Sequence, residues 1–108
     1  MRLLAGALAM ALAGAALAGG NPQAGKAKAA QVCVACHGAD GNKPSTPDQP
    51  ILGGQHYDYL VRALSDYKTG ARANPIMKGF AATLSTQDIE DLAAWFSQQQ
   101  STLHFERK

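Results

Sequence analysis

The segment Cys33-Val34-Ala35-Cys36-His37 brings two thiols and an imidazole together within five residues, and the chain has no other cysteine. The spacing C-x-x-C-H is typical of covalent haem attachment, in which the two thiols add across the two haem vinyl groups and form thioethers. The histidine that follows then lies beneath the iron and can bind it through a ring nitrogen. We therefore predict that Cys33 and Cys36 hold one haem c covalently and that His37 is an axial ligand of its iron.

Other uses of a cysteine pair fit this sequence less well. A redox C-x-x-C of the thioredoxin type needs a βαβ context, and the sequence predicts no strand before the motif. A zinc site needs about four ligands, and the remaining donors of this chain do not cluster in the sequence. A disulfide is compatible with an exported protein, but a bridge that closes so short a loop stabilises the fold little.

A second axial ligand is predicted in the later half of the chain. Met77 lies 40 residues after His37, in a segment rich in Gly, Pro and Asn, and every other methionine falls within the first ten residues. A loop of that length can bring a thioether to the opposite face of the iron. A lone methionine is more often a core residue, and His56, His104 or an open position are the alternatives. We predict Met77 as the ligand.

The start of the chain has the layout of a secretory signal peptide. Arg2 precedes an apolar run over 3–17, and Ala16-Leu17-Ala18 provides the small-x-small pattern of a cleavage site. We expect cleavage after Ala18, because the run is short and weakly hydrophobic for a retained membrane anchor. The mature chain would then be 19–108, a single small domain with a polar tail from about 99. It would be periplasmic, without stable membrane insertion.

Three helices and two long loops are predicted along the mature chain. No segment alternates apolar and polar residues long enough to form a strand, so the expected fold class is all-α. Ser85 is the expected N-cap of the last helix, with Asp88 as its capping-box partner. Loops as long as those predicted usually wrap a ligand or carry function in a small domain. The helices are expected at 22–32, 56–68 and 85–97, and the loops at 38–50 and 71–84.

Four segments in this order resemble the class I c-type cytochromes. The similarity is greatest to the small bacterial c-553 type and to one half of the related dihaem bacterial cytochromes, and it extends from about residue 25 to residue 98. It implies the cytochrome c fold, with three to five helices and long loops wrapped around one covalently attached haem. The segments that carry the resemblance are 33–41, 50–55, 74–77 and 92–96.

The resemblance also implies roles for individual residues. Met77 matches the axial methionine of the family. Pro50 matches the proline whose carbonyl accepts the second ring N–H of the axial histidine, a contact that fixes the ring and tunes its basicity. Gly25 matches the small residue that lets the last helix cross the first closely, and Trp95 stands at the aromatic position of that crossing.

Electron transfer rather than catalysis is the function implied by these ligands. Iron held by histidine and methionine has no free position, which favours outer-sphere transfer of one electron. We expect a carrier, not an enzyme, that serves redox protein partners, namely an electron donor and a terminal acceptor such as an oxidase or reductase. The alternatives are a haem c subunit of a dehydrogenase or oxidase complex, and a gas- or peroxide-reactive haem protein if Met77 does not ligate.

Charge and surface composition narrow the class of partner. Without Arg2, nine basic and eight acidic residues remain, and no dense basic cluster indicates a nucleic-acid partner. Apolar and small residues are expected to form a docking patch around the haem edge, with basic residues at its rim. The expected patch comprises Val34, Ala35, Ile51, Leu52, Ile76 and Phe80, with Lys26, Lys43, Arg72 and Lys78 around it.

Overall fold

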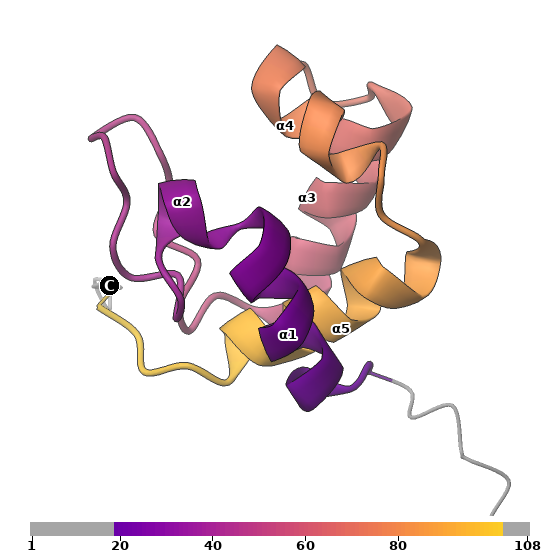
Figure 1. The fold of residues 1–108 in the computed structure, drawn as a ribbon. Helices are drawn as coiled ribbons and strands as arrows, with labels where there is room; N and C mark the ends of the chain where they lie inside the picture. The colour runs from indigo at the N-terminus through magenta and orange to yellow at the C-terminus, as the bar shows by residue number, and fades with distance from the viewer. Residues whose placement is uncertain (1–18, 103–108) are drawn as a thin grey trace, which may run out of the picture.

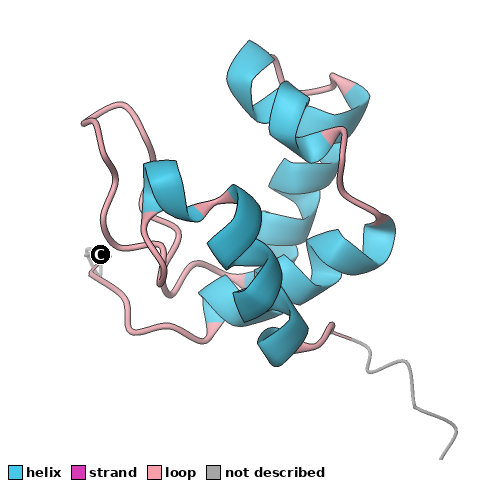
Figure 2. Cartoon of the chain, viewed as in Figure 1, coloured by secondary structure: helices cyan, strands magenta, loops and turns pink. Residues whose placement is uncertain are grey.

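Five helical segments and their connecting loops make up residues 19–102, the part of the chain that the computed structural model describes (Figures 1 and 2). No strand occurs among these residues, and the predicted all-α fold class is confirmed. The predicted signal peptide, 1–18, and tail residues 103–108 lie outside the described residues. None of the described helices combines the length and the apolar character needed to cross a membrane. The helices are α1 (Pro22–Val32), α2 (Val34–His37), α3 (Tyr57–Thr69), α4 (Pro75–Ala81) and α5 (Thr86–Ser97).

Three helix boundaries follow the signals in the sequence. The Asn21 side chain accepts hydrogen bonds from two backbone N–H groups of the first turn of α1, and Pro22 occupies the first helical position. Gly70 ends α3 with a left-handed φ of +85°. Ser85 and Asp88 form the predicted capping box at the start of α5. The three predicted helices are therefore confirmed to within one residue at these ends.

The predicted loop over 71–84 is wrong in part, because α4 occupies Pro75–Ala81. This helix begins with the same Asn-Pro pair as α1, since the Asn74 side chain accepts hydrogen bonds from the first turn and Pro75 follows it. The seven-residue length and the internal Gly79 hide the helical pattern in the sequence. Met77 consequently lies on a helix rather than on a flexible loop.

Helices α1 and α5 cross with almost no space between their backbones, and Figure 1 shows α1 lying across α5. A Cβ atom added at Gly25 would lie 1.9 Å from the Asp91 carbonyl oxygen and 2.9 Å from the Trp95 Cβ. Only glycine permits an approach this close. The structure thus confirms the close helix crossing at Gly25, with Trp95 beside it.

The buried core gathers where α1, α3 and α5 meet. Leu92 is fully buried, and it is the largest side chain of which this is true among the described residues. The rest of the cluster is made of a few aliphatic side chains and one phenylalanine, which is a small core for a domain of this size. Its members are Ala29, Leu60, Leu84, Ile89, Leu92, Ala93 and Phe96.

We expect Gly25→Ala to lower the free energy of unfolding by about 1–3 kcal/mol, because the added methyl group overlaps the α5 backbone. Chemical denaturation of the haem-loaded protein measures this loss. Gly79→Ala is the matched control, because a Cβ there meets no atom within 4 Å and the residue lies inside α4. The control should be neutral or slightly stabilising. Equal losses in both variants would contradict the crossing argument.

Candidate functional site

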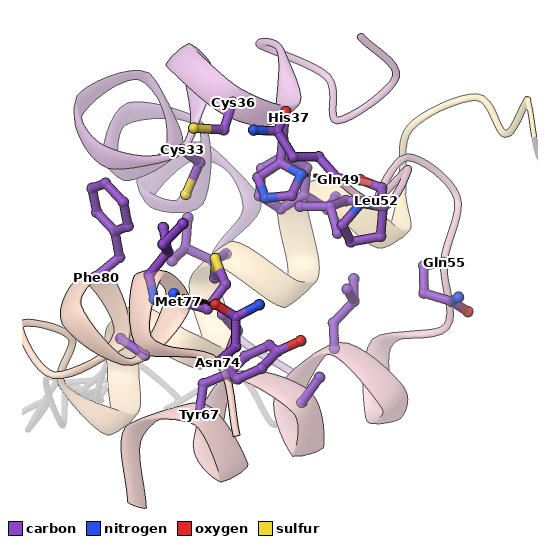
Figure 3. Close-up of a pocket in the computed structure, with 18 of the residues that line it drawn as sticks. Cys33, Cys36, His37, Gln49, Leu52, Gln55, Tyr67, Asn74, Met77 and Phe80 are labelled. Carbon is purple, nitrogen blue, oxygen red and sulfur yellow. Dashed lines mark hydrogen bonds between the residues drawn. The ribbon is translucent and has the colours of Figure 1, made fainter. Parts of the chain in front are cut away.

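A pocket of about 200 Å³ opens between the end of α1, the loop after α2, and helices α3, α4 and α5 (Figure 3). This volume is many times what one water molecule requires. Its walls are mainly aliphatic and aromatic, and polar atoms contribute the smaller part of the lining. Among the lining residues are Leu60, Leu64, Leu92 and Phe96, so the pocket continues directly from the hydrophobic core.

Cys33 and Cys36 both line this pocket, and neither is bonded to the other. Cys33 separates α1 from the single turn of α2, and this places both thiols on the pocket wall. Burial, and secondly the neighbouring Cys36, raise the pKa of the Cys33 thiol to about 11. Redox-active C-x-x-C motifs need the opposite, a lowered pKa that yields a thiolate at neutral pH. The environment of Cys33 therefore does not favour thioredoxin-type chemistry.

The His37 imidazole is buried, with 6% of its surface exposed. Its Nδ1 lies 3.0 Å from the Pro50 carbonyl oxygen, which is the contact that the family resemblance implies. A carbonyl oxygen can only accept, so Nδ1 carries the proton and donates it to Pro50. The lone pair then resides on Nε2, and the ring extends into the pocket (Figure 3). This tautomer leaves Nε2 able to bind a metal ion while the hydrogen bond to Pro50 fixes the ring.

The loop that carries Pro50 is folded against α2 by a dense set of hydrogen bonds. The His37 carbonyl accepts from the Lys43 N–H at 3.1 Å, and the Cys36 carbonyl accepts from the Ser45 N–H at 2.9 Å. Gln49 closes the turn before Pro50, because its side-chain oxygen accepts from the Ser45 hydroxyl at 2.8 Å. The role of Gln49 is not predictable from the sequence, since a glutamine in a polar loop belongs to no recognisable motif.

Residues 99–102, the start of the polar tail expected from about 99, hold the outer side of this loop. The Asn42 side chain donates to the Gln100 carbonyl at 2.8 Å and accepts from the Thr102 hydroxyl at 3.1 Å. The Gly54 N–H donates to the Phe96 carbonyl at 2.9 Å. The first residues of the polar tail are therefore ordered against the loop through these hydrogen bonds.

Met77 lines the same pocket from α4, and Figure 3 shows its sulfur and the His37 ring both directed into it. Pro50 also lines the pocket. Of the alternative ligands, His56 is the N-cap residue of α3 and does not line the pocket, while His104 lies outside the described residues. The five predicted site residues are therefore brought together at one pocket: Cys33, Cys36, His37, Pro50 and Met77.

One part of the pocket wall is polar and carries a positive charge. Arg72 is the only lysine or arginine among the lining residues, and it donates from Nη1 to the Tyr59 hydroxyl at 3.2 Å. Its guanidinium lies 4.9 Å from the centre of the Tyr67 ring. The hydrogen bond to Tyr59 is the main cause that raises the pKa of Arg72, which stays charged. The sequence predicts Arg72 on a docking rim, and it gives no signal for these contacts.

These side chains fit a haem on chemical grounds. Two thiols match its two vinyl groups, an unprotonated imidazole nitrogen and a thioether match its iron, and apolar walls match its ring. The Arg72 guanidinium suits the two carboxylates that a haem carries. The small size of the core has the same explanation, since a bound ring would supply the missing apolar volume.

The fold and the pocket define a haem-binding helical domain, and comparison with known proteins gives its family. Residues 22–100 match the family described as Cytochrome c, and the chain belongs to that family. The predicted resemblance, the fold and the presence of one covalent haem c in this domain are thereby confirmed.

Individual relatives place the chain among bacterial cytochromes. Cytochrome c4 of Pseudomonas aeruginosa is 47% identical over 96 residues, which cover 89% of this chain and 47% of that protein. The crystal structure of reduced recombinant cytochrome c4 from Pseudomonas stutzeri superposes with a TM-score of 0.69 at 43% identity, over 75% of this chain and 46% of the other. Cytochrome c-554(548) of Halomonas halodenitrificans is 39% identical over 84 residues, 75% of this chain and 99% of that protein. The chain thus spans about half the length of its cytochrome c4 relatives.

We expect Asn42→Ala to release residues 99–102 and to lower the free energy of unfolding by about 1–2 kcal/mol, because two side-chain hydrogen bonds are lost. Hydrogen exchange of the Leu52, Gly53 and Gly54 amides should also accelerate, since the tail covers this loop. Gln98→Ala, at an exposed neighbouring position, is the control and should change neither quantity. Unchanged exchange in Asn42→Ala would show that the tail does not support the loop.

Proposed function

We propose that this domain is a periplasmic one-electron carrier that uses a haem c ligated by His37 and Met77. The observation that carries the proposal is the convergence of the His37 ring and the Met77 thioether on one apolar pocket that both thiols also line. Membership of the cytochrome c family supports it.

The residues of the chain have distinct tasks in this proposal. Cys33 and Cys36 would tether the haem through thioethers, and His37 Nε2 and Met77 Sδ would bind its iron. The haem would supply the one-electron cycle between the ferrous and ferric states. Methionine ligation and burial both raise the reduction potential. Iron held by both side chains would have no position free for a substrate, which supports a carrier rather than an enzyme.

The Pro50 carbonyl and the apolar walls limit how much the site rearranges. The hydrogen bond to Pro50 keeps the His37 ring in one orientation and one tautomer. Leu60, Leu92 and Phe96 line the pocket with buried apolar side chains, which offer water no hydrogen-bond partner. An apolar site with a fixed ligand ring needs little rearrangement when its charge changes, which would favour rapid outer-sphere transfer.

A redox partner would dock on the apolar residues exposed near the two cysteines and α4. Val34 exposes 41% of its surface, and Ile76 and Phe80, which expose 70% and 43%, also line the pocket whose edge a bound haem would form. Ile51 and Leu52, which the sequence placed in the same patch, are half-buried. We propose that this surface serves an electron donor and a terminal acceptor such as an oxidase or reductase.

We also propose that the protein is exported to the periplasm. Residues 1–18 match the layout of a signal peptide, and the relatives named above are bacterial proteins. The periplasm would then be the compartment in which the haem is attached and used.

A haem c subunit of a larger dehydrogenase or oxidase complex is the alternative that one observation favours. A relative from Stutzerimonas stutzeri that is 40% identical over 72 residues is described as a thiosulfate dehydrogenase electron acceptor. A dedicated subunit would co-purify with a larger protein at stoichiometric ratio, whereas a diffusible carrier would not.

Met77→Ala tests the proposed ligand set. Loss of the thioether should lower the reduction potential by roughly a hundred millivolts or more, within the ~0.8 V range that axial ligands span. The reduced variant should bind carbon monoxide rapidly, while the parent should bind it slowly. An optical and redox titration of both proteins measures each quantity. A variant with the parent spectrum and potential would exclude Met77 as a ligand, and a parent that binds the gas rapidly would favour a gas-reactive haem protein.

Val34→Lys tests the docking surface without any partner protein. The added charge should slow electron self-exchange between two copies of the protein, because it places like charges on both surfaces at the contact. The rate is measured by nuclear magnetic resonance on mixtures of the two redox states, and the potential should stay close to that of the parent. Gln23→Lys makes the same charge change at the exposed start of α1 and is the control. Equal slowing in both variants would show only an effect of net charge.

A further inference from the structure

Asn74 makes two hydrogen bonds at the start of α4 that bear directly on Met77. Its side-chain oxygen accepts from the Ile76 N–H and from the Met77 N–H, each at 3.1 Å. Its own carbonyl accepts from the Lys78 N–H at 2.8 Å, which is the first hydrogen bond of the helix. The residue before the helix thus holds the backbone on both sides of the Met77 Cα.

The Met77 N–H cannot bond to a carbonyl of its own helix, because the first N–H groups of a helix lack acceptors within it. The side chain of Asn74 fills this role, while Pro75 restricts the backbone φ at the first helical position. This cap therefore fixes the backbone from which the Met77 side chain extends.

Helix α4 is short and packs mainly against α3. Ala81 is its only buried residue, while Ile76, Met77 and Phe80 line the pocket. The helix has seven residues, too few for backbone hydrogen bonds alone to stabilise it. Helix α4 packs against α3, whereas the longer α1 and α5 pack against each other. A local cap consequently contributes a larger share of the order of α4 than it would in a longer, buried helix.

We propose that Asn74 is the positioning residue for the second axial ligand: its cap holds α4 so that the Met77 thioether stays directed into the pocket. This inference rests on the proposed ligation by Met77. Asn74 lines the pocket as well, so its side chain links the helix start to the site itself (Figure 3). Loss of the cap should free the thioether to leave the iron without unfolding the domain.

The chain contains a matched control for this proposal. Asn21 caps α1 through the same arrangement, since its side-chain oxygen accepts from the Gln23 and Ala24 N–H groups and Pro22 follows it. Asn21 does not line the pocket. Asn21→Ala therefore removes an equivalent cap at a helix that carries no proposed iron ligand in its first turn.

Binding of free imidazole to the oxidised, haem-loaded protein is the test, because imidazole must displace the Met77 thioether to reach the iron. Asn74→Ala should tighten the apparent imidazole affinity roughly fivefold, the factor that corresponds to a typical N-cap. Asn74→Asp keeps an acceptor for both N–H groups and should restore the affinity of the parent. Asn21→Ala should lower the stability towards denaturant and leave the imidazole affinity unchanged.

The outcomes separate this inference from the proposed function. Met77→Ala should bind imidazole more tightly than any of the Asn variants. If Met77→Ala and the parent bind it equally, Met77 is not a ligand and the proposed ligand set fails. If Met77→Ala binds more tightly but Asn74→Ala does not, the ligand set stands and the positioning role is wrong. Equal tightening by Asn74→Ala and Asn21→Ala would also overturn it, since general destabilisation would then explain the effect.

Discussion

The close crossing of α1 and α5 at Gly25 determines where the chemistry of this domain can take place. Helix α1 runs directly into Cys33 and then α2, so the depth at which α1 sits on α5 sets the positions of the two thiols and His37. The same stretch of α5 fixes the following loop, because the Trp95 indole N–H donates to the Ala39 carbonyl at 3.0 Å. One turn of α5 thus positions the attachment motif and the loop that orients its histidine.

The crossing of α1 and α5 also leaves an interior that protein side chains alone do not fill. The packed cluster contains mainly small and medium aliphatic side chains, and the pocket continues from it with apolar walls. Apolar surface of this kind is costly to leave in water. A covalently attached haem resolves the problem, because it cannot dissociate and it supplies apolar area to α3, α4 and the loop before α3. The cofactor is in this sense a part of the core.

Much of the fold and of the site can be predicted from the sequence. The features that cannot be predicted have physical causes. The capping box at Ser85 and the stop at Gly70 are local, and they are confirmed because local hydrogen bonds decide them. Helix α4 is not predicted, because seven residues with an internal glycine show no helical periodicity of apolar residues. The Asn-Pro pair at its start is nevertheless a recognisable signal for a helix N-terminus. The ordered tail and the Arg72 contacts were missed because both depend on partners distant in the sequence. The contact between His37 and Pro50 came from family resemblance alone.

The acceptor of the His37 proton is a main-chain atom, and this has an evolutionary consequence. Substitution of Pro50 by another residue would leave a carbonyl oxygen at the same place in the chain, so no change of side chain can delete the hydrogen bond directly. Only displacement of the loop can break it. Selection on the orientation of the imidazole is therefore distributed over the residues that shape the loop, among them Gly41, Asn42 and Gln49. The orientation of the His37 ring therefore tolerates a change of side chain at Pro50, but it is sensitive to substitutions elsewhere in the loop that move the Pro50 carbonyl.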